Sequence, residues 1–343
     1  MKYHPTVSRF VVGLSLLAGG VRSAAAPVEF AADELKLPSS PLFALVGIAP
    51  TKIERPSSPR GFGMSLLTAM TESKGDLPKN LAFEFAPYWW EDRPALTAEA
   101  YDNSTLADVV IQSATISLAT YEKPAKGATP AYSGAGAGLR FDLIRGHVNA
   151  ALREKIQKKQ LEFLGGEFES DTLTPEQNAE LKKMALTYDS SRTGHQLSFG
   201  SAFAWRFEGN DLDNDTWDRY GAWLTYAYKP ADGKSLAAQF TALVSARYIA
   251  EHAMPDDKHY TDIGAKLLWR APEHPVSVAL EYVYRNGDAK GGSLGGLLQY
   301  KVNESWYLFI AHGKQLKGDE GDYKKVTSTG LSFAWGKGAK LKL

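Results

Sequence analysis

Apolar and polar residues alternate with a period of two along most of the chain after about residue 60. Over residues 196–208 the odd positions carry Leu, Phe, Ser, Phe, Trp and Phe, whereas the even positions carry Gln, Ser, Gly, Ala, Ala, Arg and Glu. The same alternation recurs over 235–251, 261–271 and 275–286. Because successive side chains of a strand point to opposite faces, these segments are predicted to be strands with one apolar, charge-free face.

The chain contains about twelve segments of this kind, most of them as long as the ~9–11 residues that a tilted strand needs to cross a membrane. They are 60–70, 80–90, 108–121, 132–145, 196–208, 218–229, 235–251, 260–271, 275–285, 294–301, 305–315 and 325–335. The segment 108–121 has no clean face, and 305–315 is apolar on both.

The connections between these segments alternate in length in the second half of the chain. The connections 230–234, 272–275 and 302–304 are very short. Those at 209–217, 252–259, 286–293 and 316–324 are longer and rich in Asp, Gly and Lys. Short turns at one end and longer loops at the other are typical of membrane β-barrels.

The charged residues of the polar face indicate which face is the inner one. Six of the 14 Arg lie on the polar face of a predicted strand, but only three of the 25 Lys do. Arg among carboxylates suits a crowded interior, where a planar guanidinium pairs with a carboxylate, whereas a solvated face favours Lys. The polar face is therefore predicted to line the lumen, with Glu84, Arg140, Asp142, Arg206, Glu208, Arg219, Gln239, Arg247, Glu251, Asp262, Lys266, Arg270, Glu281, Arg285 and Lys301.

Aromatic residues gather near both ends of the predicted strands. Near one end lie Tyr226, Tyr228, Trp269, Tyr300, Trp306 and Trp335. Toward the other end lie Trp205, Phe207, Tyr220, Tyr248, Tyr260, Tyr282 and Tyr284. Aromatic residues favour strands in general, but that preference does not predict clustering at both ends of the strands. Two girdles of aromatic residues at the membrane–water boundaries do predict it.

By this pattern the chain resembles bacterial outer-membrane β-barrel proteins of about twelve strands. The resemblance covers residues 60–336 and implies an all-β, transmembrane, antiparallel up-and-down barrel in the outer membrane of a Gram-negative bacterium, in contact with the lipid bilayer and lipopolysaccharide. Such barrels often finish on an aromatic residue. This chain instead continues past Trp335 into a short tail at 337–343.

The first residues are typical of an export signal. Lys2 and Arg9 precede the apolar stretch 10–21, and the small residues at 23–25 allow cleavage after Ala25. The alternative is a membrane anchor, but the stretch is shorter than the ~20 residues of a spanning helix. The mature chain is therefore expected to be exported.

Two segments do not follow the strand pattern. Residues 26–59 are rich in Pro and hold one compact apolar stretch at 42–48, so they are predicted to be an irregular plug-like or periplasmic segment, with a loose leader as the alternative. Residues 147–192 show helical spacing. Within them Thr174-Pro175-Glu176-Gln177 has the sequence of a capping box with Pro at the first helical position. A helical insertion on the periplasmic side is expected there.

Composition excludes several classes of function. Lys plus Arg and Asp plus Glu number 39 each, so no net charge attracts nucleic acid. The chain has no Cys, which excludes disulfides, thiol nucleophiles and Cys-bound zinc. No cofactor is expected.

Catalytic and metal-binding candidates are few. Ser198, Ser201, His195 and His312 are the residue types of an outer-membrane lipid hydrolase, but no local motif joins them, so no enzyme is predicted. Asp211, Asp213 and Asp215 have the spacing of hard-cation ligands. The turn Gly and the closing Glu of a calcium loop are missing, which favours a solvated acidic loop.

The function expected from these features is a channel or gated pore for small, anionic solutes. The alternative is a closed structural barrel whose periplasmic insertion 147–192 binds a partner protein.

Overall fold

The computed structural model describes residues 30–31, 41–46, 60–69, 80–90, 96–97, 100, 102–123, 132–147, 154, 158–159, 162–163, 174–177, 180, 192–207, 215–230, 236–253, 256–270, 276–288, 290–302, 306–318, 325–338 and 340–342. The predicted export signal at 1–25 lies outside these residues.

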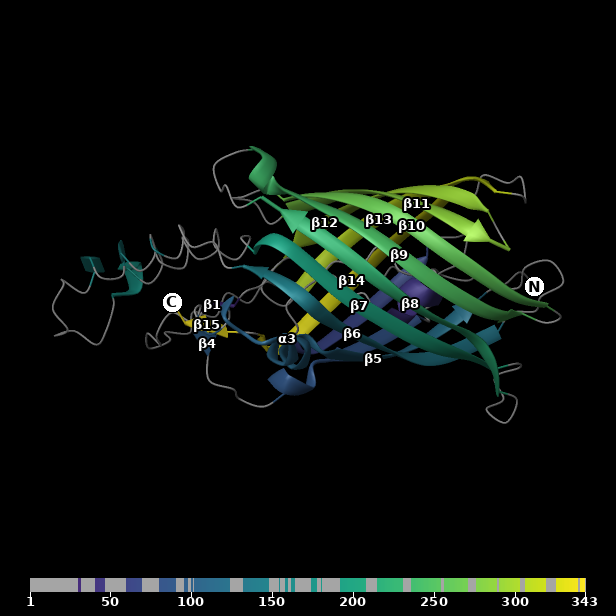
Figure 1. The fold of residues 1–343 in the computed structure, drawn as a ribbon, viewed down its shortest axis with the longest axis horizontal. Helices are drawn as coiled ribbons and strands as arrows, with labels where there is room; N and C mark the ends of the chain where they lie inside the picture. Colours follow the sequence, from purple (N-terminus) through teal and green to yellow (C-terminus); the bar gives the residue numbers. More distant parts are fainter. Residues whose placement is uncertain are drawn as a thin grey trace, which may run out of the picture.

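Twelve strands of the described chain form one antiparallel sheet that closes into a barrel (Figure 1). They are β2 (Arg60–Ala69), β3 (Asn80–Phe85), β5 (Thr115–Lys123), β6 (Tyr132–His147), β7 (Thr193–Phe207), β8 (Asp215–Lys229), β9 (Phe240–Ala253), β10 (Asp256–Arg270), β11 (Val276–Gly287), β12 (Gly291–Lys301), β13 (Trp306–Gly318) and β14 (Lys325–Gly338). Each pairs with its neighbours in sequence order, and β14 pairs with β2, with Phe333 opposite Met64. A closed ladder leaves no unpaired backbone edge.

The strands alternate in direction, so the barrel has two distinct ends. End A is the end at which β2 begins and β14 finishes, with Arg60 opposite Gly338. End B is the opposite end, at which β6 begins with Tyr132 opposite Lys123.

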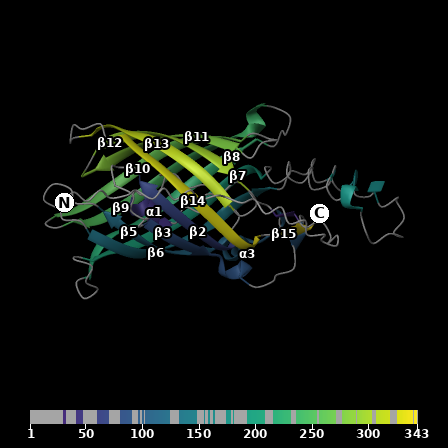
Figure 2. The same ribbon diagram turned by 180° about the vertical axis from the view of Figure 1, so that it is seen from behind.

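A small second sheet lies beyond end A (Figures 1 and 2). It consists of β1 (Phe30–Ala31), β15 (Lys340–Lys342) and β4 (Leu96–Thr97) in the order β1-β15-β4. The strand β15 pairs antiparallel with β1 and parallel with β4. The final residues therefore do not form a plain tail at 337–343, because β14 extends to Gly338 and Lys340–Lys342 join this sheet.

The prediction of a mostly antiparallel β protein with few helices is confirmed. From β6 onward, the strand bounds differ from the predicted ones by five residues or fewer. One of the larger differences is at 235–251. The strand β9 begins only at Phe240 because Leu236–Gln239 form the 3-10 turn η3.

The prediction of a strand over 108–121 is wrong for its first half. Residues Leu106–Ser113 form the helix α3, and β5 begins only at Thr115. Thr105 caps the helix, because its hydroxyl accepts from the backbone N–H of Asp108 while the Asp108 carboxylate accepts from the Thr105 backbone N–H. This capping box sets the local structure where hydrophobic alternation gave no clear signal.

The predicted strand over 80–90 is also too long. The strand β3 ends at Phe85, and Pro87–Trp89 form the 3-10 turn η1. Proline has no N–H to donate to a sheet ladder, so the strand cannot continue through Pro87.

The expected contrast in connection length does not hold. The strand β9 extends to Ala253 and β10 begins at Asp256, so most of the loop predicted at 252–259 is strand. Cross-strand polar contacts stabilise this extension, with His252 Nδ1 2.8 Å from Asp257 and Tyr248 Oη 2.9 Å from His259 Nδ1. The two longest connections between barrel strands, 86–114 and 148–192, both join strand ends at end A.

The capping box predicted at Thr174–Gln177 is confirmed. The Thr174 backbone N–H donates to Gln177 Oε1 over 2.8 Å, and the Gln177 backbone N–H donates to Thr174 Oγ1 over 3.3 Å. Lys159 contacts both Glu162, at 3.3 Å, and Glu180, at 3.7 Å, so the segments on either side of 164–173 are close together. Across the described residues, no helix has the length and apolar character needed to cross a membrane.

Candidate functional site: the barrel interior

The two faces of the barrel wall differ sharply in chemistry. Along β10 the side chains of Asp262 and Lys266 are 3% and 7% exposed, whereas those of Ile263 and Leu267 are 58% and 46% exposed. The same alternation runs through β8, β9 and β11, so the polar face is the inner face and large apolar side chains cover the outer face. A water-soluble barrel has the opposite arrangement.

Most of the charged residues predicted to line the lumen lie on the inner face. Nine are buried: Glu84, Arg140, Asp142, Arg206, Arg219, Arg247, Asp262, Lys266 and Glu281. Four more are half-buried: Glu251, Arg270, Arg285 and Lys301.

Two other predictions for the lumen have different outcomes. Gln239 does not line it, because it ends the turn η3 before β9 begins, and its Oε1 accepts a hydrogen bond over 2.9 Å from the outward-facing Trp269 indole. Glu208 lies outside the described residues.

A bulge in β8 adds an inward carboxylate that the alternation did not predict. The β7–β8 register shifts so that Ala204 pairs with Arg219 and Trp205 with Trp217, which leaves Asp218 as the extra residue. Asp218 and Arg219 are therefore both buried. The extra residue of a bulge interrupts the alternation, so a side chain expected on the outer face points to the inner one.

Asp218 belongs to a charged group near end B. Its Oδ2 accepts a 2.5 Å hydrogen bond from the Tyr121 hydroxyl, and it also accepts from Arg219 Nε over 3.2 Å. Arg219 donates in addition to Glu251 on β9. This group links β5, β8 and β9 across the inside of the wall.

A second group lies on β9, β10 and β11. Asp262 accepts from Arg247 Nη2 over 2.5 Å and from Arg285 Nε over 2.7 Å, so one carboxylate holds two guanidinium groups. Arg285 also lies over the Tyr260 ring, 4.6 Å from its centroid. Charge-assisted hydrogen bonds from a planar guanidinium hold the two groups in a defined orientation and are stronger than hydrogen bonds between neutral groups.

Two further ion pairs lie nearer end A. Arg140 Nη2 is 3.2 Å from Glu84, and Lys266 Nζ is 3.8 Å from Glu281. Each pair joins neighbouring or nearby strands of the inner face. The described carboxylates of the interior therefore all lie close to cations.

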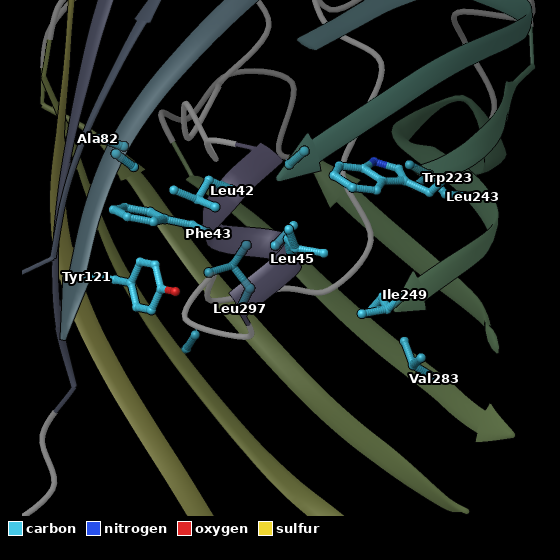
Figure 3. Close-up of a cluster of buried hydrophobic side chains, with 14 of the residues drawn as sticks. Leu42, Phe43, Leu45, Ala82, Tyr121, Trp223, Leu243, Ile249, Val283 and Leu297 are labelled. Atoms are coloured by element: carbon cyan, nitrogen blue, oxygen red, sulfur yellow. The ribbon is translucent and has the colours of Figure 1, made fainter. Parts of the chain in front are cut away.

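The short helix α1 (Pro41–Val46) lies inside the barrel, as Figure 3 shows. Leu42 and Phe43 are fully buried, and Leu45 is nearly so. The helix contacts β5, β6, β7 and β8, and Arg247 Nη1 donates to the Ala44 carbonyl over 2.8 Å. An apolar segment well before the first barrel strand thus occupies part of the lumen.

Glycines in the barrel wall leave space for side chains of α1. A Cβ at Gly136 would lie 2.8 Å from Leu42 Cδ1, and one at Gly221 would lie 2.8 Å from Leu45 Cδ1. A Cβ at Gly138 would lie 2.6 Å from Pro41 Cβ. Gly136, Gly138 and Gly221 therefore leave room for the helix against the wall.

Reasoning from sequence missed several inner residues besides Asp218. Tyr121, Trp223 and Leu243 are buried in one apolar cluster with Leu42 and Leu45 (Figure 3). They lie on the inner positions of their strands, but their apolar character gave no sign of an internal helix to contact.

The candidates for catalysis are not brought together. Ser198 is inward and buried, whereas His195 and His312 face outward. The outward Ser201 lies six residues from His195 on the same strand, about 20 Å at a strand's rise per residue. His195 Nδ1 instead contacts Tyr226 Oη at 2.5 Å.

The acidic residues proposed as metal ligands give no site within the described chain. Asp211 and Asp213 lie outside the described residues, and the Asp215 side chain is not described. Where side chains are described, no group of three or more His, Asp or Glu residues is placed to hold a metal ion.

No family model matches this chain, and no curated protein matches it. Solved structures similar to it include outer-membrane porins and channels. The KdgM porin in complex with disordered oligogalacturonate has a TM-score of 0.39 at 8% identity, with 80% of this chain and 98% of that chain covered. The outer membrane protein Omp33 of Acinetobacter baumannii has a TM-score of 0.33 at 11% identity, with 81% and 99% covered. The CymD monoaromatic hydrocarbon channel has a TM-score of 0.33 at 9% identity, with 81% and 88% covered.

Proposed function

We propose that this protein is an outer-membrane β-barrel that forms a gated, non-catalytic pore for small anionic solutes. The observation that carries the proposal is the reversed polarity of the wall, with charged side chains buried inside and large apolar side chains exposed outside. Exposed residues such as Leu224, Ile263 and Leu280 are costly in water and favourable in lipid.

The charge of the inner face supports a preference for anions. Among the predicted lumen residues that the structure describes, eight are cations and five are carboxylates, and Asp218 raises the carboxylates to six. Arg145, Arg192 and Lys229 are further buried cations near end A. Charge on a pore wall sets the selectivity of the pore.

The helix α1 is the element that would gate such a pore. It fills space between the inner faces of β5–β8, and its contacts include apolar packing and the hydrogen bond from Arg247. It is only six residues long, so few interactions hold it compared with the strand ladders of the wall. Its displacement would widen the lumen without breaking the barrel.

Single-channel recording in planar bilayers tests this function. We expect the purified protein to conduct with a preference for chloride over potassium. Replacing Leu42 and Leu45 together by Ser should raise the mean conductance or the open fraction, because the helix loses its apolar packing. The matched control replaces the exposed Leu236 of the turn η3 by Ser, which should leave conductance unchanged.

Two results would count against the proposal. An absence of conductance in both the wild type and the Leu42→Ser, Leu45→Ser variant would favour a closed docking barrel. Conductance with a cation preference would remove the anionic solute from the proposal but leave the pore.

We further propose that end A faces the periplasm. The first barrel strand begins at this end and the last one finishes there. The strands that flank the insertion 148–192 also have their connected ends there. Because the chain has no native Cys, single cysteines report sidedness directly. On intact cells an impermeant thiol reagent should label Lys258→Cys at end B and spare Lys158→Cys in the insertion. The reverse pattern would invert the orientation.

A further inference from the structure

The helix α3 occupies the position next to β6 into which β5 would otherwise extend at end A. The strand β5 begins at Thr115, opposite Arg140, and α3 ends two residues earlier at Ser113. The Ser113 hydroxyl accepts a 2.7 Å hydrogen bond from the Asp142 backbone N–H on β6. The helix therefore continues the wall of the barrel at its rim, as Figure 1 shows.

The buried face of α3 is polar. Gln112 Oε1 accepts from Arg145 Nη1 over 2.6 Å, and the Gln112 carbonyl accepts from the Trp89 indole over 2.7 Å. Ser113 is buried beside it, and Val109 is the only apolar side chain of this face among the eight residues of the helix.

The exposed face of α3 is apolar. Leu106, Ala107, Val110 and Ile111 fall within an arc of about 140° at 100° per residue. Leu106 is 61% exposed and Ile111 is 55% exposed. A surface helix of a water-soluble protein buries its apolar stripe and exposes its polar one, so α3 is reversed in the same sense as the barrel wall.

Two further exposed apolar side chains, one after η1 and one on β6, extend this apolar face at the same end of the barrel. Trp90, which follows η1, is 68% exposed, and η1 contacts α3. On β6 the register shift between Asp142 and Ile144 leaves Ile144 47% exposed. The apolar surface thus extends from the outer face of the strands onto elements outside the strand ladder.

We propose that α3 and Trp90 form an interfacial anchor, which inserts Leu106, Ile111 and Trp90 into the headgroup–acyl boundary of the leaflet at end A. The inference rests on the proposed membrane location of the barrel. Phospholipid is the occupant because the patch continues the outer apolar face and ends in a Trp, the residue enriched at membrane–water boundaries. The anchor would fix the depth and tilt of the barrel beside β5 and β6.

Site-directed spin labelling tests the anchor on the full-length protein. Single cysteines at Leu106, Ile111, Leu224 and Asn103 are labelled, and each protein is reconstituted in phosphatidylethanolamine–phosphatidylglycerol vesicles. The collision rates of each label with oxygen and with a water-soluble nickel chelate are then measured. Asn103 is exposed just before α3 and serves as the aqueous control, whereas Leu224 on β8 reports on the outer barrel face.

We expect the labels at positions 106 and 111 to collide more often with oxygen than with the nickel chelate, at a shallower depth than the label at 224. The label at 103 should show the reverse. Nickel accessibility at 106 and 111 equal to that at 103, with 224 still in lipid, would overturn the anchor and leave the pore proposal intact. Shielding of 106 and 111 from both reagents would overturn it in favour of contact with a second copy. Nickel access at 224 would contradict the membrane location itself.

Discussion

The two faces of strand β8 show how one segment meets two different environments. Tyr220, Leu224 and Tyr226 point outward and are 40–45% exposed, whereas Arg219, Trp223 and Thr225 point inward and are buried. On the outer face the side chains have few specific partners, so they need only to be apolar to suit a lipid environment. On the inner face each side chain has particular partners, which lie on other strands or on α1.

This difference predicts how each face responds to substitution. Changes on the inner face should cost stability through lost partners, and the cost should depend on which partner is lost. Changes on the outer face should depend only on polarity and on depth in the membrane. Urea titration of the protein folded in lipid vesicles measures both.

The largest effect is expected for Asp262→Ala on the inner face. The substitution leaves Arg247 and Arg285 without their shared carboxylate, and breaking a buried pair in this way costs about 3–5 kcal/mol of unfolding free energy. The exposed Lys258→Ala on the same strand should cost less than about 0.5 kcal/mol. Equal costs for the two variants would show that the inner pairs do not stabilise the barrel.

A smaller effect is expected for Leu224→Arg on the outer face. An Arg on the lipid face of a barrel near the membrane midplane costs roughly 2–4 kcal/mol, and the cost falls to about 0–1 near the boundary. Leu236→Arg, in the turn η3 at end A, is the boundary control. A Leu224→Arg variant as stable as the control would mean that the outer face does not meet lipid.

Tyr121→Phe should cost less again, about 1.5 kcal/mol, as expected for a hydrogen bond to a charged group. Arg219 continues to donate to Asp218 in this variant, so the carboxylate keeps a partner. Tyr282→Phe, on the outer face of β11, is the matched control and should be nearly neutral. A larger loss for Tyr282→Phe would reverse the expected difference between the faces.

The smallest effect is expected at α3, outside the strand ladder. Hydrogen bonds from Thr105 lower the pKa of the Asp108 carboxyl below its usual value. The folded pKa is the lower one, so this contribution to stability is complete above the unfolded pKa and is lost as the pH falls through the folded pKa. An NMR titration of Asp108 should show the pKa rising toward its usual value in the Thr105→Ala variant. An unchanged pKa would mean that the capping box does not form.

The sequence predicts the outer face better than the inner one, for a physical reason. Alternation identified most of the strands from β6 to β14 and the buried Arg and carboxylate residues among them, because the outer face requires only apolar side chains. The partners of the inner face depend on strand register and closure. Asp218, for example, faces inward only because of the bulge opposite Ala204 and Trp205.

The first third of the barrel was predicted less well. In the segment before β5 a capping box at Thr105 and Asp108 outweighs the strand propensity of Val109, Val110 and Ile111. The apolar stretch at 42–48 indicated a segment that packs against something, but the glycines that receive it lie on β6 and β8, more than 90 residues away. Contacts over such distances in sequence leave no local pattern.

The most direct test of an outer-membrane barrel is to locate the full-length chain in a Gram-negative host and examine its mobility on SDS gels. We expect it in the outer-membrane fraction, with a faster-migrating form before boiling that converts to the slower unfolded form after boiling, because a closed ladder has no edge from which to unzip. Recovery as a soluble periplasmic protein whose mobility does not change on boiling would contradict a membrane-spanning barrel.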